Sequence, residues 1–155
     1  MVIIFCDEVY MTLDQILEEW RKDAEIDSTE LGEESIKIPQ LHSKYMKIYF
    51  EERRKLKAYE FEIKDISLKK HEYYNGRMSQ DELDELEWMP FQKRLLKHEI
   101  EMYIESDKDI IKHHVKIANQ KEKMQLLEEI VKNLNQRNFQ IKNAIEWKKF
   151  TQGVQ

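Results

Sequence analysis

Apolar residues recur at sevenfold spacing along two long stretches of the chain. In the first stretch, residues 40–74, no Gly or Pro interrupts the pattern. Its two apolar lines consist of Tyr49, Leu56 and Ile63, and of Tyr45, Tyr59, Ile66 and Tyr73. Because paired lines of this spacing form the apolar seam of a coiled coil, the stretch predicts one helix about 50 Å long at 1.5 Å per residue.

The second stretch, residues 107–136, has the same spacing. His113 and Gln120 occupy one of its two lines in the first half and weaken the seam there. The apolar members of the two lines are Ile110, Ile117, Met124 and Val131, and Leu127 and Leu134. The two stretches predict an all-α protein whose frame is a long antiparallel coiled-coil-like helical hairpin, with short N- and C-terminal helices.

Two capping boxes predict where shorter helices begin: Thr12 with Gln15, and Ser79 with Glu82. In such a box the Ser or Thr side chain bonds a backbone N–H three residues on, and the Gln or Glu side chain bonds back. A helix should therefore follow each box, and the second helix should stop near Pro90.

Breakers and caps predict the remaining boundaries. Pro39 is expected in the first turn of the first long helix. The Asn-Gly pair at 75–76 should end that helix, because both residues tolerate the left-handed conformation of a C-cap. A further helix is expected at 91–102, and Ser106 is expected to cap the second long helix. We expect a break around 137–138 that separates the final amphipathic helix.

Residue types and spacings argue against an enzyme. The three glycines are isolated, so no loop can cradle a nucleotide phosphate. Cys6 is the single cysteine, which excludes an intrachain disulfide or a thiolate-rich zinc site. His113 and His114 point about 100° apart on a helix and cannot chelate one metal together. We therefore expect no catalytic residues, no cofactor and no metal site.

The hydropathy of the chain bears on its compartment. No stretch approaches the roughly 20 apolar residues that a membrane-spanning helix needs. The opening residues are too short and turn acidic too soon for a secretory signal peptide. These features favour a cytoplasmic protein without a membrane partner.

Charge alternates along the chain, although the net charge is only −5. Residues 1–42 and 78–106 are acidic, whereas residues 43–77 and 107–155 are basic. Such alternation serves pairing between subunits, or it keeps an anion site on an otherwise repelling body. Composition leaves both interpretations open.

The basic segment before the Asn-Gly pair offers candidate contacts for single-stranded nucleic acid. Cations neutralise phosphates, and exposed ring faces stack with bases. Tyr73 fits an apolar line, whereas Tyr74 projects elsewhere and is the better stacking candidate. The candidate DNA-binding residues are Arg53, Arg54, Lys57, Lys64, Lys69, Lys70, Tyr74 and Arg77.

The same segment has a second interpretation. Cations on the outside of a coiled coil commonly pair with water or with nearby acids such as Glu51, Glu60 and Asp65. From the pattern alone, the alternative is a helical coiled-coil scaffold or adaptor protein without DNA binding.

Several short stretches resemble the UvsY family, the recombination mediators of T4-like phages. They are WRKDAEIDSTEL (20–31), SKY (43–45), YYNGR (73–77), SDKDI (106–110) and FQIKNAIEWKKF (139–150). Their order and spacing carry the resemblance, which covers roughly residues 11 to 153. Family members usually begin at a position equivalent to Met11, so residues 1–10 are expected to be an N-terminal extension or a misplaced start.

The resemblance implies a recombination mediator that is not an enzyme. Such proteins bind single-stranded DNA, form rings of six or seven subunits, and load a RecA-type recombinase onto DNA covered by single-strand-binding protein. The expected partners are therefore DNA, the phage recombinase, the phage single-strand-binding protein and further copies of the chain, in the host cell cytoplasm.

The resemblance also implies where DNA and neighbouring subunits bind. The family's DNA-binding Lys-x-Arg motif precedes the tyrosine pair, and here it reads Leu68-Lys69-Lys70. Lys70 keeps a cation, Leu68 departs from the motif, and Lys69 is a substitute. Residues 11–138 would be the DNA-binding region and residues 139–155 the oligomerisation helix. The expected assembly residues are Phe139, Ile141, Ala144, Ile145, Trp147 and Phe150.

Overall fold

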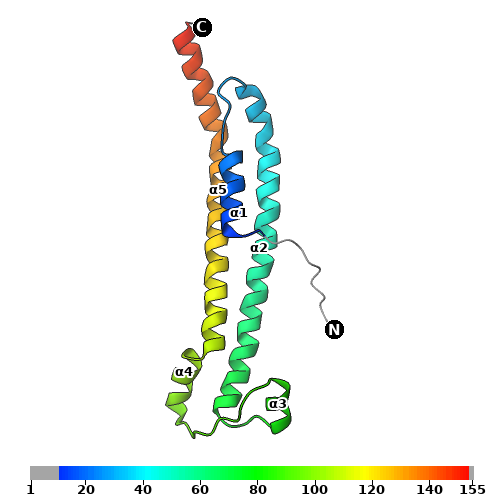
Figure 1. The fold of residues 1–155 in the computed structure, drawn as a ribbon. Helices are drawn as coiled ribbons and strands as arrows, with labels where there is room; N and C mark the ends of the chain where they lie inside the picture. The colour runs from blue at the N-terminus through cyan, green and yellow to red at the C-terminus, as the bar shows by residue number, and fades with distance from the viewer. Residues whose placement is uncertain (1–10, 154–155) are drawn as a thin grey trace. The chain divides into compact units, whose positions relative to one another are not determined.

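The computed structural model describes residues 11–153, and every regular element within them is an α-helix (Figure 1). The elements are α1 Leu13–Asp23, α2 Leu31–Tyr74, α3 Gln80–Glu85, α4 Lys97–Glu105 and α5 Lys108–Gln152. The all-α prediction is therefore confirmed for this part of the chain, and none of these helices is long and apolar enough to cross a membrane. The predicted extension, residues 1–10 with Cys6, lies outside the described residues.

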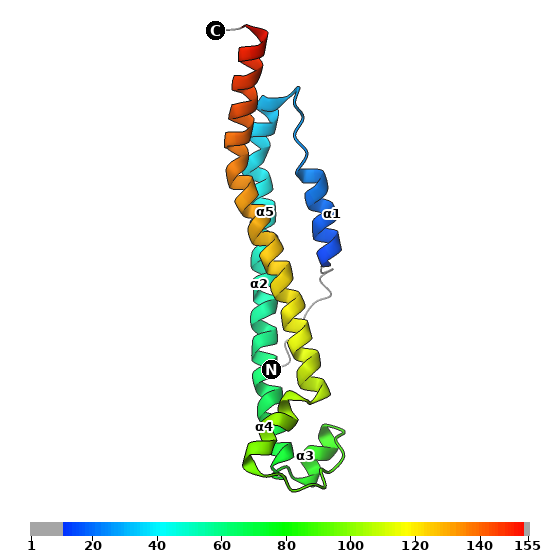
Figure 2. The same ribbon diagram turned by 90° about the vertical axis from the view of Figure 1, so that its left-hand side faces the viewer.

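The chain divides into two compact units, and each contains a segment of both long helices. Of the described residues, unit 1 holds 11–50 and 125–153, and unit 2 holds 51–124. Within each unit the α2 and α5 segments run antiparallel to one another (Figures 1 and 2). The coiled-coil character of the pair remains a prediction.

Unit 1 has an apolar core to which α1 contributes. The Thr12 capping box forms as predicted, with the Thr12 N–H donating to Gln15 Oε1 over 2.7 Å. The Trp20 and Tyr45 rings meet edge to face with centroids 5.5 Å apart. The buried residues of this core are Ile16, Tyr45, Leu127, Ile130 and Leu134. Since each buried side chain of this size contributes about 1.5–3 kcal/mol, this core is the main stabilising element of unit 1.

A second apolar cluster in unit 1 explains why both long helices extend further than predicted. Leu31 and Ile38 of α2 bury themselves against Ile141 of α5. The helix α2 therefore begins at Leu31, and Pro39 lies inside it, so the prediction that Pro39 occupies its first turn is wrong. The predicted break at 137–138 is also wrong, because α5 continues to Gln152 and this packing needs an unbroken helix.

Polar side chains occupy buried positions between α2 and α5 in unit 2. Glu52 is buried, and its carboxylate accepts hydrogen bonds from Gln120 Nε2 at 2.7 Å, Lys123 Nζ at 3.1 Å and Lys55 Nζ at 2.5 Å. Burial on its own would raise the pKa of Glu52, but these three donors outweigh it and hold the pKa below its ordinary value. Glu52 is therefore a buried anion that joins the two helices.

The connection between α2 and α5 follows two of its predicted signals. Gly76 takes a φ of 65° at the end of α2, and the N–H groups of Gly76 and Arg77 return to Tyr73 O and Glu72 O. This hydrogen-bond pair is a Schellman motif, which the predicted Asn-Gly cap allows. Ser79 then caps α3 through its capping box, also as predicted.

Two other boundaries in this connection differ from the prediction. The helix α4 begins at Lys97, and no helix begins at residue 91. Asp107, and not Ser106, caps α5, because Asp107 Oδ1 accepts from the N–H groups of Asp109 and Ile110. Carboxylate caps of this kind also interact favourably with the helix dipole.

Candidate nucleic-acid interface

All eight predicted DNA-binding residues lie in unit 2, on α2 or just after it, but the structure divides them. Four of them form an exposed group, here called the α2 cationic face: Arg53, Arg54, Lys57 and Lys64. Arg54 lies about 180° around the helix from the half-buried Ile63, at 3.6 residues per turn, so the face is turned outward. Within residues 11–153, no acidic side chain pairs with these four cations.

Phe61 is an exposed aromatic residue within this face that the sequence prediction missed. Its side chain is 68% exposed, and Lys64 Nζ lies 5.6 Å from its ring centroid. Phe61 falls on neither of the sevenfold apolar lines, and from this the sequence could have predicted that its side chain is exposed. An exposed ring between cations suits base stacking, so Phe61 is a candidate stacking residue.

Lys70 is the residue whose surroundings differ most from the expectation. Its side chain is buried, with Nζ 2.7 Å from Asp109 and 3.0 Å from Asp107. The same ammonium lies 4.1 Å from the ring centroid of Trp88. Burial alone would lower the pKa of Lys70, but the two carboxylates raise it above its ordinary value. Lys70 is thus an internal cation of unit 2, which corrects the expectation that it faces a DNA phosphate.

Tyr74 is also committed to contacts within unit 2. Its hydroxyl donates to Asp107 Oδ2 over 2.7 Å, and burial together with this carboxylate raises the pKa of Tyr74. Its ring meets Phe91 at 5.0 Å and Tyr103 at 5.6 Å between centroids. The rings in contact here, called the aromatic cluster, are Tyr73, Tyr74, Trp88, Phe91 and Tyr103. Tyr74 therefore packs its hydroxyl and ring against other residues of unit 2, which makes it a weaker stacking candidate than the sequence suggested.

The two remaining candidates sit at the surface. Lys69 Nζ pairs with Asp65 over 2.7 Å, and both side chains are partly exposed. Exposed pairs of this kind contribute about 0–1 kcal/mol, so a phosphate can displace Asp65. Arg77 is exposed directly after the Gly76 turn. Both residues remain candidate DNA contacts.

The predicted oligomerisation residues, all in unit 1, also divide into two groups. Ile141 is buried, and Ala144 and Ile145 pack on the same cluster. Ile141 is therefore committed to the core of its own subunit, whereas Ala144 and Ile145 are partly exposed and remain predicted assembly residues. Phe139, Trp147 and Phe150 are 70%, 66% and 78% exposed. The rings of Trp147 and Phe150 stack with centroids 5.8 Å apart, and they form an apolar surface on the last turns of α5.

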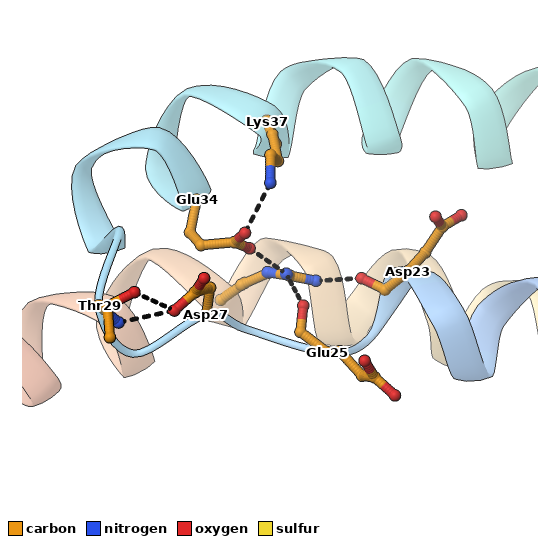
Figure 3. A network of polar contacts seen from close by, with 7 residues as sticks. Asp23, Glu25, Asp27, Thr29, Glu34 and Lys37 are labelled. Carbon is orange, nitrogen blue, oxygen red and sulfur yellow. Dashed lines mark hydrogen bonds and ion pairs between the residues drawn. The ribbon is translucent and has the colours of Figure 1, made fainter.

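A buried polar network in unit 1 was missed by the sequence prediction (Figure 3). The guanidinium of Arg137 donates to Asp23 O at 2.6 Å, Glu25 O at 2.7 Å and Glu34 Oε2 at 2.8 Å. Glu34 also accepts from Lys37 Nζ at 2.7 Å. The hydrogen bond from Lys37 is the largest influence on the pKa of Glu34, which lies below its ordinary value. Arg137 thereby ties the α1–α2 connection to α5.

The side chains in residues 11–153 that could act as metal ligands do not form a metal site. Across residues 11–153 there is no group of three or more His, Cys, Asp or Glu side chains that could hold a metal ion. The carboxylates of interest in unit 2, Glu52 and Asp107, are instead saturated by ammonium, amide and hydroxyl donors.

Comparisons with known proteins agree on one family. Residues 19–154 match the family described as recombination, repair and ssDNA binding protein UvsY. Two crystal structures of the bacteriophage T4 recombination mediator protein UvsY are similar at 26% sequence identity. Lattice type II gives a TM-score of 0.76 and covers 91% of this chain and 98% of that one. Lattice type I gives a TM-score of 0.74 and covers 88% of this chain and 98% of that one.

A third crystal form of the same T4 protein supports the fold alone. Lattice type IV is 24% identical, with a TM-score of 0.79 over 90% of this chain and 99% of that one. No protein sequence with curated function matches the chain significantly.

Proposed function

The chain belongs to the UvsY family, and from this premise we propose that it is a recombination mediator that binds single-stranded DNA. The observation that carries the proposal is the α2 cationic face with the exposed Phe61. Cations without acidic partners release counterions when they meet phosphates, and an exposed ring stacks with any base. The site thus favours a flexible, unpaired strand over a sequence-specific duplex.

The proposal includes two protein partners, a RecA-type recombinase and the single-strand-binding protein that it displaces. Family membership supports this step, since the T4 relative is itself described as a recombination mediator. The three glycines of the sequence are isolated, so we assign ATP chemistry to the recombinase and none to this chain. Its proposed place of action is the cytoplasm of the phage's host cell.

Assembly into a ring of six or seven copies is the third part of the proposal. One subunit offers only a few free cations, whereas a ring contacts one strand many times and multiplies weak contacts. The exposed rings of Phe139, Trp147 and Phe150 are the surface that a neighbouring copy would cover. We therefore place the oligomerisation segment on this outward face of α5 within residues 139–155.

Titration of the full chain against a fluorescent single-stranded oligonucleotide at several salt concentrations tests the proposal. The logarithm of the affinity should fall by about 0.7 per phosphate contact for each log unit of salt. Mass measurement in parallel should show a six- or seven-subunit particle. An oligomer that ignores the strand even at low salt would favour the alternative, a helical scaffold or adaptor without DNA binding.

Replacement of Trp147 and Phe150 by Ser tests the assembly surface. The particle should dissociate while the helical content stays unchanged, because both side chains are exposed in the subunit. A matched change at exposed Phe50 and Leu17, outside the proposed surface, should leave the mass intact. A particle of unchanged mass in the Trp147 and Phe150 variant would place the interface elsewhere.

A further inference from the structure

The α2–α5 pair in unit 2 has two flanks, and side-chain contacts between the helices identify one of them. Lys116 Nζ of α5 lies 3.0 Å from Glu62 Oε2 and 3.8 Å from the ring centroid of Tyr59, both on α2. Lys112 lies on this side too, because it lines a hollow of about 320 Å³ together with Lys116 and Ile66. We call this side the paired flank.

Helical geometry places a second set of cations on the opposite side. At 3.6 residues per turn, Arg53 and Lys64 lie about 160–180° around α2 from Glu62. By the same measure, His114 and Lys121 lie about 140–160° around α5 from Lys116. These four residues therefore share the other side of the helix pair, here called the open flank.

The register of the two helices brings members of the open flank to matching levels. Lys70 meets Asp109, Glu62 meets Lys116, and Glu52 meets Gln120. These antiparallel pairs place Lys121 level with the segment 53–57 of α2, and His114 level with Lys64. Since packed helices lie about 8–10 Å apart, one strand can contact both helices at each level.

Charge pairing differs between the two flanks. On the paired flank Lys116 has Glu62, Lys123 has Glu52 and Lys69 has Asp65, whereas no acid in residues 11–153 pairs with Lys112. On the open flank, Arg53, Lys64 and Lys121 are exposed, and no acid in residues 11–153 pairs with them. Cations without an acidic partner therefore gather on the open flank, where an anionic strand can reach them, although Glu60 lies on the same side of α2.

We propose that the DNA-binding surface of unit 2 spans both long helices, with Lys121 and His114 of α5 contacting phosphates beside Arg53, Lys57 and Lys64 of α2. The inference rests on the proposed function and adds a second helix to its site. A strand held between two rows of cations is fixed in direction along the pair, whereas a single row leaves it free to roll around α2. The ligand is single-stranded DNA, and the cations of both helices contact its phosphates.

The chain offers a matched pair of variants for the test. Lys121→Ala and Lys112→Ala each remove one exposed lysine from the same helix in the same unit, one from the open flank and one from the paired side. Losing one phosphate contact should weaken binding at 0.1 M salt about fivefold and reduce the salt slope by about 0.7. Lys121→Ala should show both changes, His114→Ala a smaller loss, and Lys112→Ala neither.

The outcomes separate this inference from the proposed function. If Lys57→Ala with Lys64→Ala weakens DNA binding but Lys121→Ala behaves like Lys112→Ala, the two-helix surface is wrong and the single-helix site stands. The two-helix surface is also wrong if Lys121→Ala keeps its affinity for DNA but no longer binds a protein partner. If the unmodified protein does not bind the oligonucleotide, the proposed function itself fails. Circular dichroism and mass control for folding and assembly of each variant.

Discussion

Units 1 and 2 share the same two long helices, but α2 buries different kinds of side chain in the two units. In unit 1, α2 buries Leu31, Ile38 and Tyr45, with Glu34 as the charged exception. In unit 2 the buried positions of α2 are Glu52 and Lys70, each joined to α5 through side-chain hydrogen bonds. The stabilisation from apolar burial does not depend on ionisation, whereas a buried ion pair stabilises only when both partners are present and charged.

This difference suggests a division of labour between the units. Buried ion pairs contribute little net stability compared with apolar packing, so unit 2 is expected to open more readily than unit 1. Unit 2 also carries the candidate DNA surface, and binding regions commonly lie in the less stable parts of a protein. Unit 1 carries the exposed rings proposed for assembly.

Arg137→Ala is expected to have the largest effect, and it falls in unit 1. The change leaves the buried carboxylate of Glu34 and the carbonyls of Asp23 and Glu25 without a donor. Removing one partner of a buried pair costs about 3–5 kcal/mol. Urea unfolding measures the loss, and Lys132→Ala, an exposed residue of the same helix, should change the free energy of unfolding little. A neutral Arg137→Ala would mean that the apolar cores alone hold α1.

Lys70→Met should destabilise unit 2 by about 1–3 kcal/mol, because Asp107 loses a buried charged donor. Hydrogen exchange resolved by residue should show the loss within residues 51–124 and not in unit 1. Lys57→Met is the matched control, since Lys57 is exposed and should lower DNA affinity without changing exchange. If Lys70→Met weakened DNA binding at unchanged protection, Lys70 would be a direct contact after all.

Acid should weaken unit 2 through Glu52 and Asp107. Both carboxyls have folded-state pKa values below their ordinary values of 4.5 and 3.8, so the unfolded chain binds more protons in this range. Their contribution is therefore fully present above about pH 4.5 and is lost as the pH falls through the folded pKa values. Hydrogen exchange between pH 5 and 3 should show the loss, and Glu52→Gln should flatten it. An unchanged pH dependence in Glu52→Gln would mean that Glu52 does not contribute to the acid sensitivity of unit 2.

Phe61→Ala should give the smallest effect, a loss of about 1 kcal/mol in binding single-stranded DNA, at the lower end of base–aromatic stacking. Because Phe61 is exposed, the free energy of unfolding should stay the same. Tyr74→Phe is the comparison, since it removes the bond to Asp107 while keeping the ring. Tyr74→Phe should lower the stability of unit 2 and leave the stacking of Phe61 on DNA bases unchanged. Equal affinity of Phe61→Ala and the unmodified protein would argue that phosphates alone bind the strand.

Local sequence signals predicted the helical class and several ends correctly. The capping boxes at Thr12 and Ser79 and the turn at Gly76 depend on residues within a few positions of one another. The predicted break at 137–138 was wrong, and Arg137, seven residues after Ile130, in fact continues a buried line. Periodicity was the better guide there.

The site was harder to predict because its decisive contacts are distant in sequence. Lys70 bonds Asp109, which is 39 residues away, and Tyr74 bonds Asp107, which is 33 residues away. A stripe of cations along one helix does not reveal which members meet an acid from another helix. Ile141 presents the same difficulty, since its partners Leu31 and Ile38 are far from it in the sequence.

One paired titration tests whether the exposed cations of unit 2 bind single-stranded DNA. Lys57→Ala with Lys64→Ala removes two exposed cations from α2 in unit 2, and Lys22→Ala with Lys132→Ala removes two exposed lysines from unit 1. The first variant should bind more weakly and with a smaller salt slope, whereas the second should bind as the unmodified protein does, at equal stability and mass. Equal losses in both variants, or none in either, would contradict DNA binding by the unit 2 cations.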